Sequence, residues 1–526
     1  MKNLRLLSLV FCGMIVAFLS SCSESPKTLD AIPKEAQLVA VVDGYALTQK
    51  GELDKLNELK SVQAASKEIK NESKSASKLV EKVLEDPKTT GIDLRKEVLI
   101  YLTSNEPSNQ FVGITAELFD DGKFKTFIEE ALNETKTSDS ILQKGPYNII
   151  TNGRDYTLTW DGDKLLFLVA QSYKSRNTLL EKADEFMKLS PGDNISANSS
   201  FKKFFENKKD LSLWLTGGLL ANGREFAHLR KQLGDNFADN SASFFLNFEK
   251  GAIRAQVSVD LTSETKKRFE KFNIGGGKFD RKLLAYFPET TYGLISTSMN
   301  TEAYYDNMME QPEIKNVEPM VSVATGVPLK DIITNFKGNM VLSLSGMEEN
   351  GSDFTPYMGL AMDYEKKEII EKLLEKVPGG MLQQTDGYYS LPIPGKFPVY
   401  MALGDKALLV TTDPASRDAF TGTKKLKRTL AENSARADKI ENNNTYLYLN
   451  LNTAEYPENF RTQTMGRLNS KEQKAMDIWN GLMENIEITN SNVTSSEVVF
   501  HMKGDENSLR EIIKALDENY LLFASM

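Results

Sequence analysis

The chain has 526 residues, a formal net charge of −9, 40% hydrophobic and 26% charged side chains. These proportions are typical of globular proteins, and they exclude a collagen, a wholly disordered chain and a small disulfide scaffold. At about 150 residues per domain, the length allows two to four domains. The acidic balance and the scattered basic residues argue against a nucleic-acid groove, because neutralising phosphates requires clustered Lys and Arg.

Residues 1–21 have the pattern of an export signal. Lys2 and Arg5 precede an uncharged, mostly apolar run from Leu6 to Ser20, which suits a signal core better than a membrane span of about 20 residues. The run ends in Leu-Ser-Ser before Cys22, which resembles the bacterial lipobox. We therefore predict cleavage before Cys22 and attachment of lipid to its thiol. The alternative is an uncleaved anchor with an incidental cysteine.

Lipidation at Cys22 would determine both the redox chemistry and the location of the mature chain. Cys12 would leave with the signal, so no disulfide could form within the chain. We expect residues 22–30 to be a polar tether and the acyl chains to hold the protein on a membrane. Ser23, rather than Asp, after Cys22 favours the outer membrane of a bacterial cell envelope. The periplasmic or surface face stays open.

In the first half of the chain, apolar and alternating runs predict strands separated by helices. The strands are expected at residues 38–42, 98–103, 111–114, 156–160, 165–169, 211–215, 244–248 and 253–259. A long Lys-, Ser- and Glu-rich stretch at 47–85 and an apolar stripe beginning at Phe124 predict helices. Asp161, Gly162 and Asp163 between two strands have the composition of a hairpin turn.

The second half repeats this order. The strands are expected at residues 292–296, 340–345, 357–360, 399–403, 407–411, 446–450, 486–488 and 498–502, and a helix is expected from Ile369. The segment 378–398, rich in Gly, Pro and aromatic residues, is expected to be a loop around a strand at 388–391, and we find no counterpart for it in the first half. The halves therefore look like an internal duplication.

These patterns predict an α+β fold made of two related repeats, each a largely antiparallel sheet faced by helices. The expected divisions are the signal peptide at 1–21, the polar tether at 22–30, the first repeat at 31–274, a Gly linker at 275–278 and the second repeat at 279–526.

One short motif carries a family resemblance. After the lipobox, the run from Ile32 to Ala36 (Ile-Pro-Lys-Glu-Ala) precedes a Val-rich strand that ends near Asp43 and Gly44. With about 500 residues of sheet and helix to follow, the chain resembles the Bacteroidetes-type cell-envelope lipoproteins that are grouped as a domain of unknown function. The resemblance implies an exported lipoprotein, and it brings no catalytic residues.

Few residues are suited to catalysis or to metal binding. The chain has only two histidines, His228 and His501, far apart in sequence, so a Ser-His-Asp triad or a histidine-rich zinc site is hard to assemble. We predict no catalytic residues, no metal site and no cofactor. A carboxylate pair for glycan hydrolysis stays open, because 73 acidic residues offer many pairs and the decisive separation is spatial.

Tyr388 and Tyr389 are the candidate binding residues. Adjacent strand residues point to opposite faces, so we expect at least one of the two rings beside the 378–398 segment to be exposed. The alternative is that both rings close the core. The hypothesis that follows is a non-enzymatic envelope lipoprotein that acts as a binding platform for another envelope protein or a glycan. Its rivals are a carboxylate-dependent glycan hydrolase and a carrier that holds an apolar ligand between sheet and helices.

Overall fold

The computed structural model describes residues 26–72, 74–104, 110–135, 139–221, 235–271, 275–276, 279–350, 353–378, 381–393, 397–492 and 494–524. Contacts within the chain divide it into two compact units. Unit 1 contains the residues up to Thr265 together with residues 504–526, and unit 2 contains Lys266–Lys503. The fold is α+β in both units.

Unit 1 contains strands of ordinary length and short helices. Its strands are β1 (Leu38–Val42), β2 (Val98–Leu102), β3 (Phe111–Glu117), β4 (Leu142–Lys144), β5 (Tyr147–Thr151), β6 (Tyr156–Trp160), β7 (Lys164–Ala170), β8 (Leu211–Thr216), β9 (Ser241–Glu249) and β10 (Ala252–Asp260). Its α-helices include α2 (Gly44–Gly51), α3 (Lys60–Glu72), α4 (Lys74–Glu85), α5 (Asp121–Thr135), α6 (Tyr173–Arg176), α7 (Leu179–Met187), α8 (Ser199–Glu206), α9 (Gly217–Ala221), α20 (Ser508–Glu518) and α21 (Tyr520–Ala524). Its 3-10 helices include η1 (Lys27–Ala31), η2 (Leu53–Glu58), η3 (Pro87–Thr90), η5 (Ile195–Ala197) and η7 (Asp235–Asp239).

The unit 1 strands form one antiparallel sheet in the order β4-β5-β6-β7-β3-β2-β1-β8-β9-β10. Apolar side chains on both faces of this sheet are covered by helices. Val39 and Trp214 belong to a core with α7 and α8, while Trp160 belongs to a second core with α4 and α5. Two apolar faces explain why several strands are apolar without strict alternation.

Unit 2 contains the second set of strands and helices. Its strands are β11 (Gly293–Ser298), β12 (Phe336–Asn350), β13 (Asp353–Tyr364), β14 (Gln383–Thr385), β15 (Tyr388–Leu391), β16 (Val399–Leu403), β17 (Ala407–Thr411), β18 (Thr445–Asn450), β19 (Met483–Asn492) and β20 (Ser495–Met502). Its helices include η8 (Arg281–Tyr286), α12 (Thr301–Met308), α13 (Pro312–Thr325), α14 (Leu329–Asn335), α15 (Lys367–Glu375), α16 (Pro414–Phe420), η9 (Leu430–Glu432), α17 (Ser434–Glu441), η10 (Thr453–Glu455), α18 (Glu458–Met465) and α19 (Ser470–Leu482). Helix α11 (Ser263–Lys271) spans the boundary between the units.

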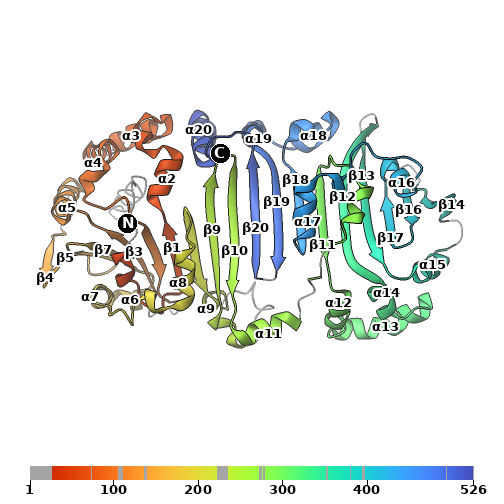
Figure 1. Ribbon diagram of the computed structural model, residues 1–526. Coiled ribbons are helices and arrows are strands. Elements are labelled where there is room, and N and C mark those ends of the chain that lie inside the picture. Colours follow the sequence, from red (N-terminus) through yellow and green to blue (C-terminus); the bar gives the residue numbers. More distant parts are fainter. Residues whose placement is uncertain are drawn as a thin grey trace. The chain divides into compact units, whose positions relative to one another are not determined.

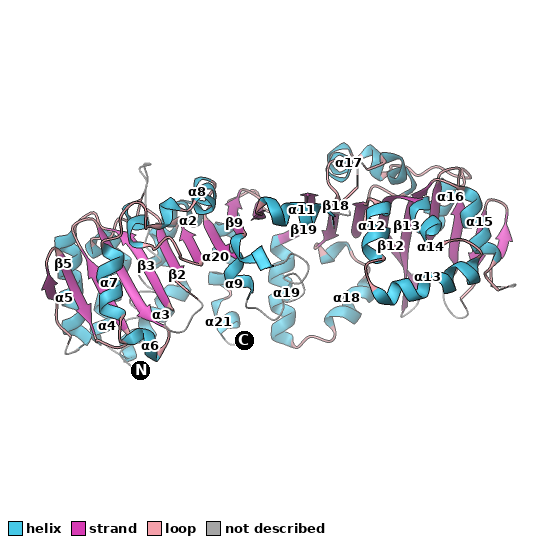
Figure 2. Cartoon of the chain, turned by 90° about the horizontal axis from the view of Figure 1, so that it is seen from below, coloured by secondary structure: helices cyan, strands magenta, loops and turns pink. Residues whose placement is uncertain are grey.

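The unit 2 sheet is also antiparallel, in the order β14-β15-β16-β17-β13-β12-β11-β18-β19-β20. Helices α12, α13 and α14 lie at one end of its strands, and α18 and α19 lie at the other end (Figure 1). Figure 2 shows α17 on one side of this sheet and α13 and α18 on the other. Adding ten to each strand number of the unit 1 order gives the unit 2 order, so corresponding strands of the two sheets have the same neighbours. An ancestral duplication of the halves stays a prediction.

The C-terminal segment belongs to a different unit from the one that the sequence suggests. Contacts place residues 504–526 in unit 1 rather than with residues 279–503. Helix α20 packs on α2 and β9. The Asp517 carboxylate accepts hydrogen bonds from the amide and the hydroxyl of Ser61, both at 2.7 Å, and the Asn507 amide donates to the Phe248 carbonyl at 3.0 Å. The expected division at residues 275–278 could not anticipate this return of the chain.

Part of the expected polar tether is folded. Residues 27–31 form η1, in which Thr28 and Leu29 are buried. The Lys27 amide donates to the Glu117 carboxylate at 2.7 Å, and its ammonium group lies 2.7 Å from Asp163. Leu29 joins the hydrophobic core beside α7. Burial of this apolar side chain favours a folded segment although several neighbouring residues are polar. The stretch 22–30 is therefore not a tether throughout.

The segment 378–398 does have a counterpart in the first half, contrary to the expectation. Its strands β14 and β15 pair as a hairpin and continue into β16, as β4 and β5 continue into β6. Strand β4 is short, and all its residues are exposed, so it has no apolar pattern that sequence reasoning could detect.

Among the described residues, no helix has the length and the apolar character needed to cross a bilayer.

Candidate functional site

The two faces of β18 use their apolar side chains differently. Tyr446 and Tyr448 are buried in a core with α17. Leu447 and Leu449 alternate with them and therefore point to the opposite side of the sheet, where Leu449 is 42% exposed. We call this opposite side the second face of unit 2.

Apolar side chains continue across the second face from strand to strand. Pairing registers place one residue from each of β12, β11, β18, β19 and β20 in a row. The row consists of Leu342, Ile295, Leu447, Ile488 and Val498. None of these residues is fully buried, and Ile295 is 38% exposed. A water-facing side of an antiparallel sheet normally carries polar residues, so this row is suited to an apolar occupant.

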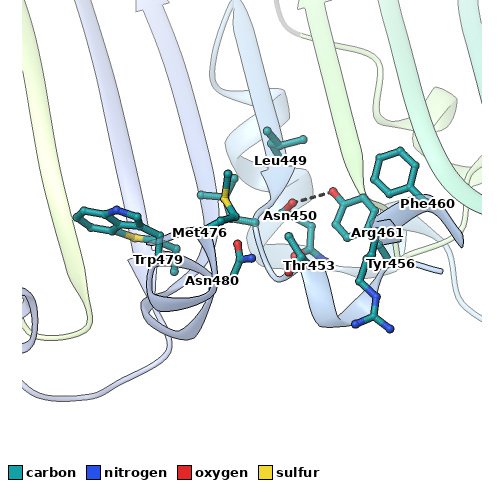
Figure 3. A pocket seen from close by; sticks show the side chains of 11 residues that line it. Leu449, Asn450, Thr453, Tyr456, Phe460, Arg461, Met476, Trp479 and Asn480 are labelled. Carbon is teal, nitrogen blue, oxygen red and sulfur yellow. Dashed lines mark hydrogen bonds between the residues drawn. The ribbon is translucent and has the colours of Figure 1, made fainter. Parts of the chain in front are cut away.

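A groove of about 350 Å³ adjoins the second face, between the end of β18, helices α18 and α19, and the start of β19. It is lined by Leu449, Asn450, Leu451, Thr453, Tyr456, Phe460, Arg461, Met476, Trp479, Asn480 and Met483 (Figure 3). We call it the apolar groove. Most of its lining is apolar or aromatic, and no carboxylate is among the lining residues that the structure describes.

Helix α19 contributes one wall of the apolar groove. Trp479 and Asn480 follow Met476 by three and four residues, so these side chains lie on one side of the helix, and Met483, the first residue of β19, follows directly after it. Met476 and Trp479 are 41% and 37% exposed, which is unusual for large apolar side chains that face a sheet. The start of the helix is held by a capping box between Asn469 and Glu472.

An aromatic stack forms the opposite wall. The ring centroids of Tyr292 and Tyr456 are 4.4 Å apart, and those of Tyr456 and Phe460 are 5.3 Å apart. The Tyr456 hydroxyl donates to the Asn450 carbonyl at 2.8 Å (Figure 3). Burial raises the pKa of Tyr456 to about 12, so this phenol is neutral at pH 7. The wall is therefore uncharged, and its rings are fixed by one another.

Two hydrogen-bond donors in the lining have no partner among the described residues. These are the Nε of Arg461 and the amide Nδ2 of Asn480, and both atoms are buried. Lys503 lies close to Asn480 because its ammonium group donates to the Asn480 carbonyl at 2.7 Å and to Asn452 Oδ1 at 2.8 Å. The apolar groove thus combines an apolar interior with unsatisfied donors and positive charge.

A second pocket, of about 330 Å³, lies in unit 1 and has a different character. It is lined by Ser200, Lys203, Phe204, Asn207, Lys209, Ser243, Phe245, Gln256, Ser258 and Asp260. Phe204 and Phe245 stack at 5.5 Å, and Lys203 pairs with Asp260 at 3.5 Å. Asp260 is the only carboxylate among the described residues of this lining, whereas glycoside hydrolysis uses a pair.

Glu487 is the centre of a buried polar cluster on the face of the unit 2 sheet that also carries Tyr446 and Tyr448. Its carboxylate accepts hydrogen bonds from Lys439, from the Tyr446 hydroxyl at 2.7 Å and from His501 at 3.1 Å. Burial raises the pKa of Glu487, but the hydrogen bonds from His501, Lys439 and Tyr446 outweigh it and lower the pKa from 4.5 to about 2. A fully satisfied carboxylate of this kind is structural. His501 thus contacts a structural carboxylate, and His228 lies outside the described residues.

Tyr388 and Tyr389 are both half-buried on β15 and do not line the apolar groove. The Tyr388 ring meets Tyr400 edge-on at 5.6 Å, and the Arg417 guanidinium lies over both rings, at 4.8 and 4.4 Å. Tyr388 is therefore engaged within unit 2, whereas Tyr389 pairs across the sheet with Met401. A binding role for these tyrosines stays a prediction. It can no longer be argued from the absence of a counterpart to the 378–398 segment, because β4 and β5 correspond to β14 and β15.

Several other predictions fall on different parts of the chain. Cys22, the signal at 1–21 and linker residues 277–278 lie outside the described residues. Trp160 and Trp214 are fully buried, as strand residues of this size are expected to be. Sequence reasoning did not single out α19, although Met476, Trp479 and Met483 at helical spacing were a detectable signal. Within the described part of the chain, no group of three His, Cys, Asp or Glu side chains could hold a metal ion.

Comparison with known proteins identifies a family without assigning an activity. The family model described as "Domain of unknown function (DUF4836)" matches residues 29–509. No curated protein matches the chain. Two solved structures, both of TP0453, match this chain with low sequence identity and low TM-scores. Crystal form III is 9% identical, with a TM-score of 0.26, over 48% of this chain and 88% of that chain. Crystal form I is 11% identical, with a TM-score of 0.26, over 45% and 80%. Likenesses at this TM-score have no bearing on the function of this chain.

Proposed function

The chain belongs to this family of unknown function, and from that premise we propose that it is a non-enzymatic binding protein of the bacterial envelope that holds an apolar ligand in the apolar groove of unit 2. One observation supports the proposal above all. Leu449, Met476 and Trp479 remain about two-fifths exposed in a concave site beside an aromatic wall. Concave, mostly apolar sites with a few polar groups are the usual form of small-molecule sites.

Of the other hypotheses, the glycan hydrolase receives less support from these two sites. Hydrolysis of a glycosidic bond needs two carboxyl groups about 5 to 10 Å apart. Among the described lining residues, the apolar groove has no carboxylate and the pocket of unit 1 has one. Binding without catalysis is therefore the better proposal. The apolar lining favours an alkyl or aromatic ligand over a glycan or a polar protein surface.

The envelope location is part of the proposal and rests on the signal pattern that ends at Cys22. Lipid on Cys22 would hold the chain on a membrane, most simply the outer membrane, because Ser23 follows the cysteine. An apolar ligand is most available at such a surface, since molecules with long alkyl chains partition into bilayers. The membrane location and the apolar groove would then both favour binding of an apolar ligand.

The proposal can be tested with an uncharged apolar fluorescent probe, phenylnaphthylamine, titrated into the full chain. The variant Met476→Asp places a charge in the apolar groove, and we expect it to weaken probe binding by about tenfold or more. The matched control is Met320→Asp on α13, where Met320 is 70% exposed and far from the groove lining. Equal binding by wild type and Met476→Asp, or no binding by wild type, would contradict the proposal.

A further inference from the structure

The unsatisfied donors of the apolar groove call for an acceptor. Arg461 Nε and Asn480 Nδ2 are buried without a partner in the part of the chain that the structure describes. Buried donors are nearly always hydrogen-bonded, and an unsatisfied one has a free-energy cost that a ligand oxygen would remove. In Figure 3, Asn480 and Arg461 both lie toward the lower edge of the lining, below Leu449. In that view the two side chains lie on opposite sides of Thr453, Asn480 on α19 and Arg461 on α18, so each donor offers a separate position for a ligand oxygen.

The charges at the apolar groove indicate that this acceptor is an anion. Arg461 is the only basic or acidic side chain among the described residues of the lining, and Lys503 beside Asn480 donates to two neutral oxygens. Glu455, which precedes Tyr456 of the lining, is already engaged by the amides of Asn450 and Asn452, at 2.6 and 3.0 Å. Charge-assisted hydrogen bonds from a guanidinium favour a carboxylate or a phosphate.

The second face provides space for a long apolar chain beyond this polar edge. Leu449 lines the groove, and Leu447, on the same face of β18, belongs to the apolar row that includes Ile295. Strands are about 4.8 Å apart, so the row from Leu342 to Val498 extends over about 19 Å. An extended ligand could therefore continue from the groove onto the sheet.

We propose that the ligand is an amphiphile with a long alkyl chain and an acidic head group, either a carboxylate or a phosphate. The alkyl chain lies in the apolar groove and along the second face, and the head group accepts a hydrogen bond from Arg461. This inference rests on the proposed function and adds the charge of the ligand. An acidic amphiphile differs from a neutral hydrocarbon in its charge and from a glycan in its long apolar chain.

The full chain offers a built-in reporter for this inference. Trp160 and Trp214 are buried in unit 1, whereas Trp479 lines the apolar groove. A ligand in the groove should therefore change the fluorescence of Trp479. The titrants are dodecanoate, its uncharged methyl ester and dodecyl phosphate, and the background is Cys22→Ala, so that no acyl chain of the protein competes. Calorimetry of the same titrations gives affinities that do not depend on fluorescence.

We expect dodecanoate or dodecyl phosphate to bind about tenfold more tightly than the methyl ester. Tighter binding of one of the two acids identifies the head group. The variant Arg461→Gln should reduce the affinity for the acid to that for the ester and leave ester binding unchanged. The exposed Arg467→Gln, on the same segment but outside the lining, is the matched control. Unfolding midpoints of both variants check that unit 2 remains folded.

The results distinguish this inference from the proposed function. Equal affinity for acid and ester, or an acid preference that survives Arg461→Gln, would overturn the inference while apolar binding stands. Failure of phenylnaphthylamine and of all three alkyl compounds to bind would overturn both.

Discussion

The Glu487 cluster allows a quantitative prediction about the stability of unit 2. The carboxylate accepts hydrogen bonds from Lys439, Tyr446 and His501, and only 11% of its side chain is exposed. Its folded pKa of about 2 lies below the ordinary value of 4.5. A lowered pKa means that the ionised form stabilises the fold, so this contribution is complete above pH 4.5 and disappears as the pH falls toward 2.

The magnitude follows from the two pKa values. Each pH unit between them corresponds to about 1.4 kcal/mol, so ionised Glu487 contributes about 3 kcal/mol to the free energy of unfolding at pH 7. At pH 3 the carboxylate is still mostly ionised when folded but mostly protonated when unfolded, and the contribution falls to about 1 kcal/mol. We expect Glu487→Gln to be less stable than wild type by about these amounts at the two pH values.

The measurement must report on unit 2 alone, because a chain with two units need not unfold in one step. Fluorotryptophan labelling gives each of the three tryptophans its own fluorine NMR signal. Trp479 reports on unit 2, and Trp160 and Trp214 report on unit 1. Urea titrations at pH 7 and pH 3 then give the stability of each unit in wild type, Glu487→Gln and a control.

The control is Glu484→Gln, an exposed glutamate on the same strand, for which we expect a change below about 0.5 kcal/mol. If Glu487→Gln is as stable as wild type at pH 7, ionised Glu487 does not stabilise unit 2 and the prediction is wrong. A stability difference of the same size at both pH values would also contradict it, because the lowered pKa of Glu487 requires the difference to shrink in acid.

Three further predictions concern other parts of the chain. Cys22→Ala is expected to leave the protein unprocessed or released from membranes, and mass spectrometry that finds residues 1–21 on the wild-type mature protein would contradict this. Removal of residues 504–526 is expected to lower the urea midpoint of the Trp214 signal and to leave that of Trp479 nearly unchanged, because the segment belongs to unit 1; equal loss in both signals would contradict the division into units. Tyr389→Ala is expected to reduce the yield of a crosslinked partner in native membranes with little change in melting, and an unchanged yield would remove this tyrosine from the binding hypotheses.

Local sequence patterns were sufficient to predict many strands. The expected bounds at 38–42, 156–160, 388–391, 399–403 and 407–411 coincide with β1, β6, β15, β16 and β17. These strands are apolar or aromatic runs next to turn residues, so the signal lies within a few neighbouring positions. The α+β class and the antiparallel sheets follow from the order of such runs. The short polar strand β4 escaped because its pairing depends on β5 and not on its own residues.

The binding site was less accessible to the same reasoning. Tyr388 and Tyr389 stood out because they are adjacent aromatic residues near Gly and Pro, but Tyr388 packs against Tyr400 and Arg417. The apolar groove combines Leu449 of β18 with Trp479 of α19. No local pattern shows that an apolar strand residue stays exposed, since exposure depends on which distant helix covers it.

The composition class, the export pattern that ends at Cys22, the periodicity of the main strands and helices, and the scarcity of histidine and cysteine can all be read from the sequence alone. These are properties of single residues or of neighbours along the chain. Contacts in the folded chain are what join residues 504–526 to unit 1, bury Leu29, and bring Arg461 and Asn480 into the lining of one apolar groove. Each of these depends on contacts between segments distant in sequence, because burial and hydrogen-bond satisfaction are set by what the rest of the chain brings to a residue.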